Sequence, residues 1–509
     1  MEKKKIYVFL FSFLLAVAGM GKAQLFSLQP GTSFQPLFLD SLKNQNNFYD
    51  WQDNAASLLE DESSKSFWVG VNTFNISGDF RLPFTAQEIR RQNFFVRTVY
   101  PLSENDLFKG TFIYHHQVDK AVFWLNQSRH VQENPFLFAD SSSGEFRLNG
   151  LFWSAEWAHR FSPSILFGLG FFYNVEQRLK QVFPKPLDKN RDIFIKTGLQ
   201  FTLKHWKIGL TYHFVSEQEK VEIKKYNLEQ NLTPTLFKFR YFDLPVILRG
   251  RTSEERKVEY IAHAWGLQLA RDFDLFSAAC FLRYVLAQSE TMDGGSRAQD
   301  EGHYQKKEFK AGIKIVRERH AAKYFIEYQY MNRFLDAYHP DFNFIIIKHP
   351  FEEHRIDMGF KWKLSSRSSL FSDFLFNQYW EYKQDLVTNN HWQYTYQTYS
   401  LRLGLNQKWS KAWQNDLWLG YSHFNYPENE RTNQDYSDFY VYLYEKPYYF
   451  HIGKDFEYQA GIKIIYRYLP VLDTELGTIF YQQMGQLTNI YNKKRINMQF
   501  FLNIKLFIF

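Results

Sequence analysis

The sequence predicts an all-β fold, a transmembrane antiparallel β-barrel of about 14–18 strands. Three observations lead to this prediction: apolar and polar residues alternate with a period of two in many segments, short and long polar connections alternate, and aromatic residues make up 19% of a chain whose mean hydropathy is −0.44. A membrane barrel combines an apolar outer band and aromatic girdles with a polar lumen. The alternative fold, a secreted β-sandwich or propeller, does not account for so many aromatic rings in so polar a chain.

The first 23 residues have the pattern of a signal peptide. Three lysines at Lys3–Lys5 precede the apolar run Ile6–Ala18, and Gly21 and Ala23 are small residues at the positions that a signal peptidase reads. We expect cleavage between Ala23 and Gln24. The alternative is an uncleaved anchor helix, but the apolar run is shorter than the ~20 residues that span a bilayer. Residues 24–65 then form a periplasmic tail or a small plug segment, and residues 66–509 form the barrel.

The closing segment shows the alternation most clearly. Ile496, Met498, Phe500, Leu502, Ile504, Leu506 and Ile508 share one face, and the opposite face carries Asn497, Gln499, Asn503 and Lys505 together with Phe501 and Phe507. Successive side chains of a strand point to opposite faces, so Leu502 and Ile504 are expected to face lipid and Asn503 the lumen. Similar alternation recurs at residues 193–204, 356–364 and 456–468.

The connections give an independent indication of the fold. Short turns are predicted at residues 103–106, 161–164, 205–206, 273–274, 319–322, 365–368 and 410–414, and longer polar loops near residues 128–145, 183–191, 227–257, 291–304, 338–353 and 428–449. Short periplasmic turns and long external loops alternate in this way in outer-membrane barrels, which have an even number of strands.

With these features in place, the chain resembles the single-domain outer-membrane β-barrel proteins of Gram-negative bacteria. The closing residues, with Phe507 and the terminal Phe509, are similar to the signal that such proteins present to the barrel-assembly machinery. The stretch Asn134–Asp140 (Asn-Pro-Phe-Leu-Phe-Ala-Asp) resembles an uncharacterised family of such barrels. The resemblance implies an outer-membrane location and that route of assembly, but no substrate.

Basic residues outnumber acidic residues on the faces predicted to line the lumen. The basic set is Lys196, Lys204, Lys310, Lys314, Lys361, Lys363, Arg402, Lys463, Arg467 and Lys505, and the acidic set is Glu308, Asp357 and Glu457. A positive lumen favours anionic solutes, and we select Lys361, Lys363, Lys463 and Arg467 as the candidate lumen-lining residues. The alternative is that many of these lysines lie near the periplasmic rim and simply face water.

Other side chains have the chemistry of metal ligands or nucleophiles. His339, His349, Glu352, Glu353 and His354 are predicted to gather in one external loop, but their spacing matches no metal-ligand pattern. Residues 293–301 contain carboxylates without the ligand register of a calcium loop. Cys280, the single cysteine, is expected to be a buried structural thiol. We therefore predict no metal, cofactor or catalytic residue.

These features suggest three classes of function. The first is a passive channel or ligand-uptake pore that prefers anions, and the alternative is a structural or secretion-linked barrel that anchors a periplasmic or surface protein. An outer-membrane enzyme is the third. The expected partners are outer-membrane lipid, the barrel-assembly machinery and a small solute of unknown identity. Residues 1–23 hold four lysines and one glutamate of a chain with a net charge of +7, so the mature chain, at +4, is too weakly basic for nucleic acid.

Overall fold

The structure is a computed structural model, and it describes residues 54–61, 65–79, 81, 85–123, 126–128, 133–140, 142–182, 185–224, 236–240, 243–248, 253–295, 297–319, 321–342, 344–432, 454–469, 472–485 and 494–507. The predicted signal peptide and its cleavage site, most of the segment 24–65, and Phe509 lie outside these residues. No helix within the described ranges is long and apolar enough to cross a membrane.

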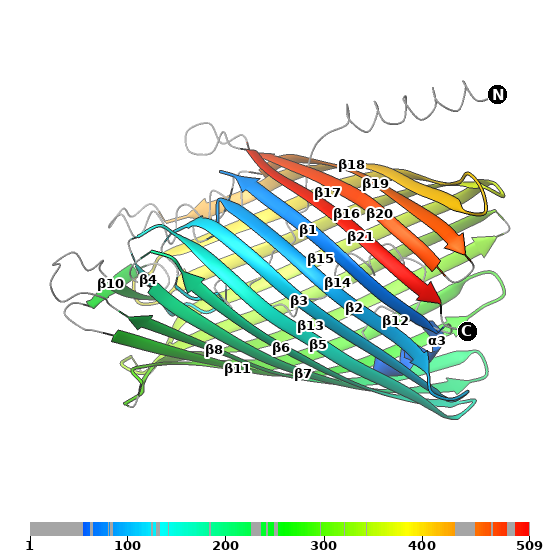
Figure 1. Cartoon of the computed structure of the whole chain (residues 1–509). Helices are drawn as coiled ribbons and strands as arrows, with labels where there is room; N and C mark the ends of the chain where they lie inside the picture. Colours follow the sequence, from blue (N-terminus) through cyan, green and yellow to red (C-terminus); the bar gives the residue numbers. More distant parts are fainter. Residues whose placement is uncertain are drawn as a thin grey trace, which may run out of the picture.

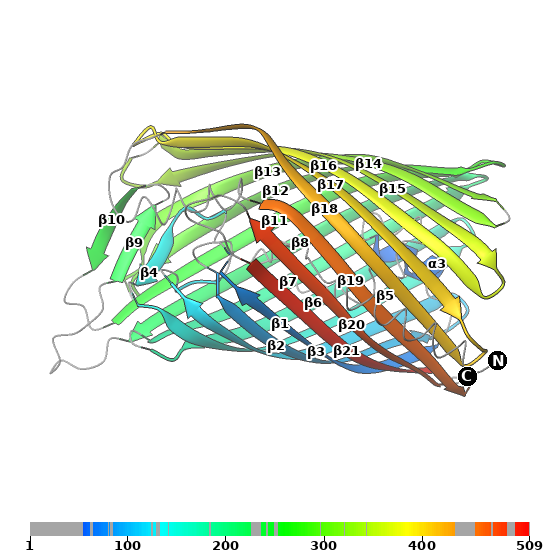
Figure 2. The same ribbon diagram turned by 90° about the horizontal axis from the view of Figure 1, so that it is seen from above.

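Eighteen antiparallel strands form a closed barrel, as the sequence predicts (Figures 1 and 2). Each strand pairs with the next along the chain, and the first pairs with the last over Ser66–Gly78 and Arg495–Phe507. Closure leaves no unpaired edge, the condition for a β-structure to span a bilayer. The strands are β1 (Ser66–Gly78), β2 (Glu88–Pro101), β3 (Asp106–Val122), β5 (Gly144–Ser162), β6 (Ile165–Lys180), β7 (Lys185–Leu203), β8 (Trp206–Lys224), β11 (Ser253–Asp272), β12 (Ser277–Asp293), β13 (Gln299–Arg319), β14 (Ala322–His339), β15 (Phe344–Ser365), β16 (Ser368–Asp385), β17 (His391–Lys408), β18 (Trp413–Arg431), β19 (Lys454–Leu469), β20 (Leu472–Gly485) and β21 (Lys494–Phe507).

The two ends of the barrel differ in their connections. At one end, the short-turn end, the eight turns are two to four residues long, and seven of them match the predicted turns. The opposite end, the long-connection end, carries the extended segments between β3 and β5, β8 and β11, and β18 and β19. All six predicted loops contain strand residues. The largest overlaps with barrel strands are residues 185–191, 299–304 and 344–353, because polar strand ends continue the ladder beyond the lipid band.

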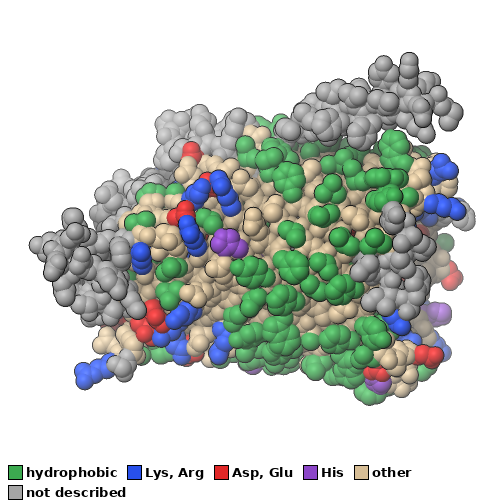
Figure 3. All heavy atoms as spheres, in the orientation of Figure 1, with side chains coloured by type: hydrophobic (Ala, Val, Ile, Leu, Met, Phe, Trp, Pro, Cys, Tyr) green, Lys and Arg blue, Asp and Glu red, His purple; other side chains and the backbone are tan. Residues whose placement is uncertain are grey.

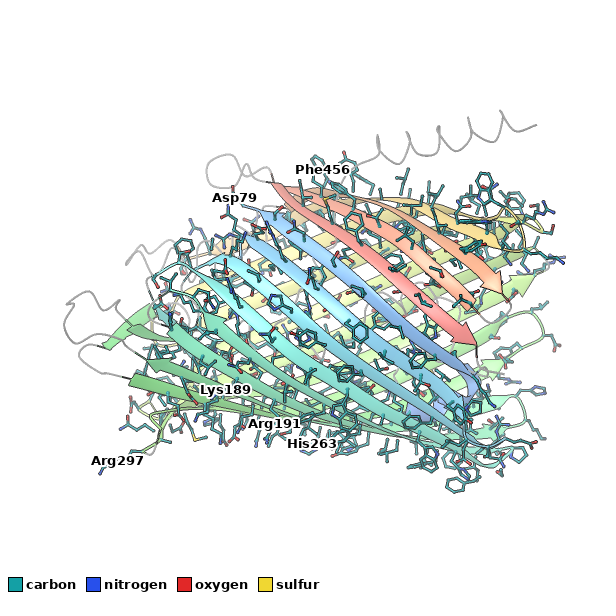
Figure 4. The ribbon with its side chains drawn as sticks, viewed as in Figure 1. Asp79, Lys189, Arg191, His263, Arg297 and Phe456 are labelled. Carbon is teal, nitrogen blue, oxygen red and sulfur yellow. The ribbon has the colours of Figure 1, made fainter. Side chains whose placement is uncertain are left out.

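The outer surface carries the apolar band that the alternation predicts (Figure 3). On β21, Leu502 and Ile504 are 44% and 40% exposed and face outward, whereas Asn503 is 3% exposed and faces the lumen. Charged outward residues gather beyond this band near the long-connection end, where Lys189 and Arg191 of β7 stand outside the barrel (Figure 4). Lys189 pairs there with Glu222 of β8 at 3.1 Å.

The prediction that Cys280 is a buried thiol is wrong. This residue is exposed on the outer face of β12, beside Leu282. The inner face of β12 is also apolar, with Phe281 and Val285 buried, so the local sequence does not reveal which face points to lipid.

Candidate functional site

The connection between β3 and β5 folds into the barrel. Its described residues, 126–128, 133–140 and 142–143, are here called the inner loop, and they include the short strand β4 (Leu137–Asp140). Phe136, Leu137, Phe138 and Ala139 are each at most 3% exposed. β4 pairs with β9 (Leu236–Arg240), which pairs with β10 (Asp243–Leu248), so a small sheet lies at the long-connection end (Figure 2). A connection of this length therefore occupies the lumen instead of extending into solvent.

One buried ion pair and one buried hydrogen bond anchor the inner loop to the wall. Lys180 of β6 donates to both carboxylate oxygens of Asp140, at 2.7 and 2.8 Å, and to the carbonyl of Ser142 at 3.0 Å. Arg256 of β11 donates to the carbonyl of Phe136 at 3.0 Å while its other nitrogens bind Asp293 of β12. Removing one partner of a buried ion pair such as Lys180–Asp140 costs about 3–5 kcal/mol, so this pair contributes most to fixing the position of the loop.

Glu133 forms a third anchor on a different part of the wall. Its carboxylate accepts from the ammonium group of Lys306 on β13 at 3.0 and 3.2 Å and from the guanidinium of Arg333 on β14 at 3.3 Å. The three side chains are between 8% and 12% exposed. One carboxylate is thus held between two cations within the barrel.

An apolar cluster surrounds the inner loop. Phe136, Leu137 and Ala139 pack with inward-facing residues of β1, β2, β3, β5, β11–β15, β17 and β18. Part of this cluster is aromatic: Tyr379 lies 4.5 Å from Tyr396 between ring centroids, and Trp392 stacks on Tyr394 at 5.1 Å. The long-connection half of the lumen is therefore packed, although an 18-stranded barrel is wide enough for an aqueous channel.

A second segment enters the lumen from the short-turn end. The turn η3 (Ala55–Ser57) and the helix α3 (Leu58–Asp61) lie against β5, β6 and β7, and Leu58 packs on Val99, Leu107 and Ala158. The backbone at Gly168 approaches so closely that a Cβ there would lie 2.1 Å from the Ala55 carbonyl carbon. Asn54 donates to Gln268 of β11 at 2.9 Å.

The candidate lumen-lining residues fall into two groups. Lys463 and Arg467 pair with Asp416 and Asp473 on neighbouring strands, at 3.2 and 3.3 Å. Lys361 and Lys363 are exposed at the short-turn end of β15, on the inward-facing side with Gly359. The structure does not bring the four side chains together in one cluster.

Three further members of the predicted basic set also have carboxylate partners. Lys196 lies 2.8 Å from Glu156, Lys314 3.5 Å from Glu327, and Arg402 2.5 Å from Asp373. The predicted charge imbalance is therefore smaller than the sequence indicates, because neighbouring strands supply acidic partners that the alternation pattern does not identify.

The candidate metal-binding residues of the sequence do not form a cluster. His349 and Glu353 face inward on β15, whereas Glu352 and His354 face outward, since alternate residues of a strand lie on opposite faces. Among the described residues no group of three or more histidine, cysteine or acidic side chains is arranged to hold a metal ion. In the segment 293–301, which lacks the register of a calcium loop, Asp293 and Glu301 both bind Lys238, at 2.8 and 2.6 Å.

The position of the inner loop inside the barrel is not predicted by the sequence pattern, which placed these residues in an external loop, although Asn134–Asp140 is the stretch that resembles an uncharacterised barrel family. The signal was present in its apolar residues, which are unusual for an external loop. Residues Phe136–Ala139 of such a loop would expose three large side chains to water, and burial in the lumen avoids that exposure.

Solved structures with a similar fold include the outer membrane transporter YddB from Escherichia coli (6% identity, TM-score 0.43, 88% of this chain and 81% of that one). A second is the siderophore receptor PiuA from Acinetobacter baumannii, with 8% identity and a TM-score of 0.44 over 87% of this chain and 82% of that one. A third is the ferric yersiniabactin uptake receptor FyuA from Yersinia pestis, with 7% identity and a TM-score of 0.47 over 88% of this chain and 80% of that one. At these values the likeness concerns barrel architecture alone.

No curated protein matches the sequence. A family match nevertheless covers residues 55–507, from the turn inside the lumen to the closing strand. The closed barrel and its apolar outer band place the protein in the outer membrane. The chain is thus an outer-membrane β-barrel protein, and it belongs to the family described as Family of unknown function (DUF6850).

Proposed function

We propose that this protein is a ligand-uptake barrel whose lumen is closed by the inner loop, and that solute passes when the loop leaves the wall. The observation that carries the proposal is the attachment of the inner loop through the side chains of Asp140 and Glu133, which bind Lys180, Lys306 and Arg333. These contacts hold the loop against the wall, and movement of the loop away from the wall would have to break them.

The apolar contacts of the inner loop set the strength of the closure. Leu137 and Phe138 are 0% and 1% exposed, and truncation of such residues to alanine costs about 2–5 and about 3–5 kcal/mol. The double variant Leu137→Ala/Phe138→Ala should therefore weaken loop docking by roughly 5–10 kcal/mol if the two effects add. The barrel wall, held by its strand ladder, should keep its fold.

We propose in addition that the open barrel prefers anions. Lys463 and Arg467 bind carboxylates, so we assign the preference to Lys361 and Lys363, which lie exposed at the short-turn mouth. Two ammonium groups beside a water-filled mouth raise the local concentration of anions, and added salt screens this effect.

Planar-bilayer conductance and solute uptake into liposomes test the proposal. The refolded wild-type barrel is compared with Leu137→Ala/Phe138→Ala and with the control Leu401→Ala/Leu403→Ala, which truncates two outward-facing residues of β17. We expect more frequent or larger openings in the inner-loop variant, and openings in the control equal to those of the wild type.

A folded inner-loop variant that neither conducts nor admits solute would contradict the proposal. Heat-modifiable migration in gels establishes that each variant is folded. In that case the barrel that anchors a periplasmic or surface protein becomes the better explanation, and co-purifying partners are the next measurement.

A further inference from the structure

We infer that Lys306 and Arg333 form a binding site for organic carboxylates, and that Glu133 of the inner loop occupies this site when the barrel is closed. The inference rests on the proposed function, because it identifies the chemical class of ligand that releases the loop. Displacement of Glu133 by a free carboxylate would detach one of the three anchors described above.

The geometry around Glu133 is that of a carboxylate bound by two cations. Both of its oxygens lie within 3.2 Å of the Lys306 ammonium group, and one lies 3.3 Å from a guanidinium nitrogen of Arg333. Lys306 and Arg333 come from adjacent strands, β13 and β14, which hold their backbones at a fixed separation. The two cations therefore belong to the rigid wall, whereas the carboxylate belongs to a connection.

The charges near this position favour an additional anion. Lys383 of β16, a buried third cation, interacts electrostatically with Glu133, Glu381 and Arg333. Glu381 itself binds His349 at 2.6 Å and accepts a hydrogen bond from the Tyr394 hydroxyl. If Glu133 leaves, the three cations face two remaining carboxylates, Glu381 and Glu308, the latter opposite Arg333 in the ladder. One positive charge is then left over, and buried cations without counter-charges are unfavourable. A ligand carboxylate restores the balance.

The surroundings of the two cations suit a ligand with an apolar or aromatic body. The Lys306 ammonium lies 5.6 Å from the centroid of the Tyr260 ring, and the Arg333 guanidinium lies 4.6 Å from that of Phe351. Tyr260 and Tyr304 belong to the apolar cluster around the inner loop. An aromatic carboxylate would place its charge between the cations and its ring against these side chains.

Titration of the refolded full-length barrel in zwitterionic detergent tests the inference, with 4-fluorobenzoate as the probe and ¹⁹F NMR as the readout. The uncharged 4-fluorobenzamide serves as the matched ligand control. In Glu133→Gln the internal competitor is lost, and we expect the affinity for 4-fluorobenzoate to rise at least about tenfold over the wild type. Asp140→Asn is the matched control variant, since it also removes an inner-loop carboxylate but leaves Lys306 and Arg333 untouched.

Three results would support the inference together: tighter binding in Glu133→Gln, no comparable gain in Asp140→Asn, and loss of the gain in Glu133→Gln/Arg333→Gln. Equal affinities in the wild type and Glu133→Gln, or binding of the amide as tight as binding of the acid, would overturn it. If Glu133→Gln does not fold, the wild type is titrated beside Arg333→Gln. Carboxylate-specific binding that Arg333→Gln lacks supports the site, and no such difference overturns it.

The outcome is separable from that of the proposed function, because binding is measured in micelles without any transport. Carboxylate binding by a barrel that never conducts would retain the site and contradict uptake. Conductance that Leu137→Ala/Phe138→Ala increases, without carboxylate-specific binding at Lys306 and Arg333, would retain uptake and contradict the site.

Discussion

A charge on the lipid face of β17 should destabilise the barrel far more than a charge at the preceding residue. Leu401 is 46% exposed on the outer surface between Tyr399 and Leu403. Ser400 faces the lumen, where its hydroxyl donates to that of Ser422 at 2.7 Å. Leu401→Arg and Ser400→Arg thus place the same side chain at nearly the same depth on opposite sides of the wall.

The magnitude follows from the position of Leu401 along the strand. The outward residues from Tyr399 to Leu405 span about 16 Å of the membrane normal, at about 3.4 Å per residue and a tilt of about 40°. This span lies within an apolar band of about 25 Å, so arginine at position 401 should cost about 2–4 kcal/mol. On the polar inner face, arginine at position 400 should cost about 1 kcal/mol or less.

Denaturant unfolding in phospholipid vesicles measures both variants, with the fluorescence of the 13 tryptophans as the signal. Leu401→Ala controls for the loss of the leucine side chain itself. Equal losses of unfolding free energy in Leu401→Arg and Ser400→Arg would refute the assignment of faces on β17, and a larger loss in Ser400→Arg would reverse it.

Three further predictions concern the lumen and the chain terminus. Gly168→Val should expel the segment 54–61, because the new Cβ would lie 2.1 Å from Ala55, and protease should then cleave this segment. The control Gly420→Val, whose Cβ would lie 3.4 Å from its nearest neighbour, should leave the segment protected from protease. Lys361→Glu/Lys363→Glu should shift the reversal potential in a salt gradient toward the value of a cation-selective pore. The control Lys463→Gln/Asp416→Asn removes an ion pair with no net charge and should leave the reversal potential unchanged. A wild type that selects cations would contradict the assignment of anion preference to Lys361 and Lys363. N-terminal sequencing of protein from the outer-membrane fraction should begin at Gln24, and an intact Met1 would refute the signal peptide.

The barrel and the faces of its strands follow from the sequence because strand alternation is a local property. Whether Leu502 faces lipid or Asn503 faces the lumen depends on the immediate neighbours of each residue, and both predictions agree with the structure. The even number of strands follows from the barrel class, and seven of the short turns follow from the short polar connections between strands. The expectation that Cys280 is buried was wrong, and alternation does not correct it locally, because both faces of β12 are apolar where its inner face belongs to the packed part of the lumen.

Contacts between segments distant in the sequence were decided by the tertiary structure. Lys196 pairs with Glu156 two strands away, and Glu133 pairs with Lys306 and Arg333 because the inner loop lies inside the closed barrel. Such pairs depend on the register of every intervening strand and on closure between β1 and β21, neither of which is encoded near the residues concerned. The sequence by itself therefore determined a membrane barrel with charged groups in its lumen, whereas the fold determined which charges neutralise one another and which segment fills the lumen.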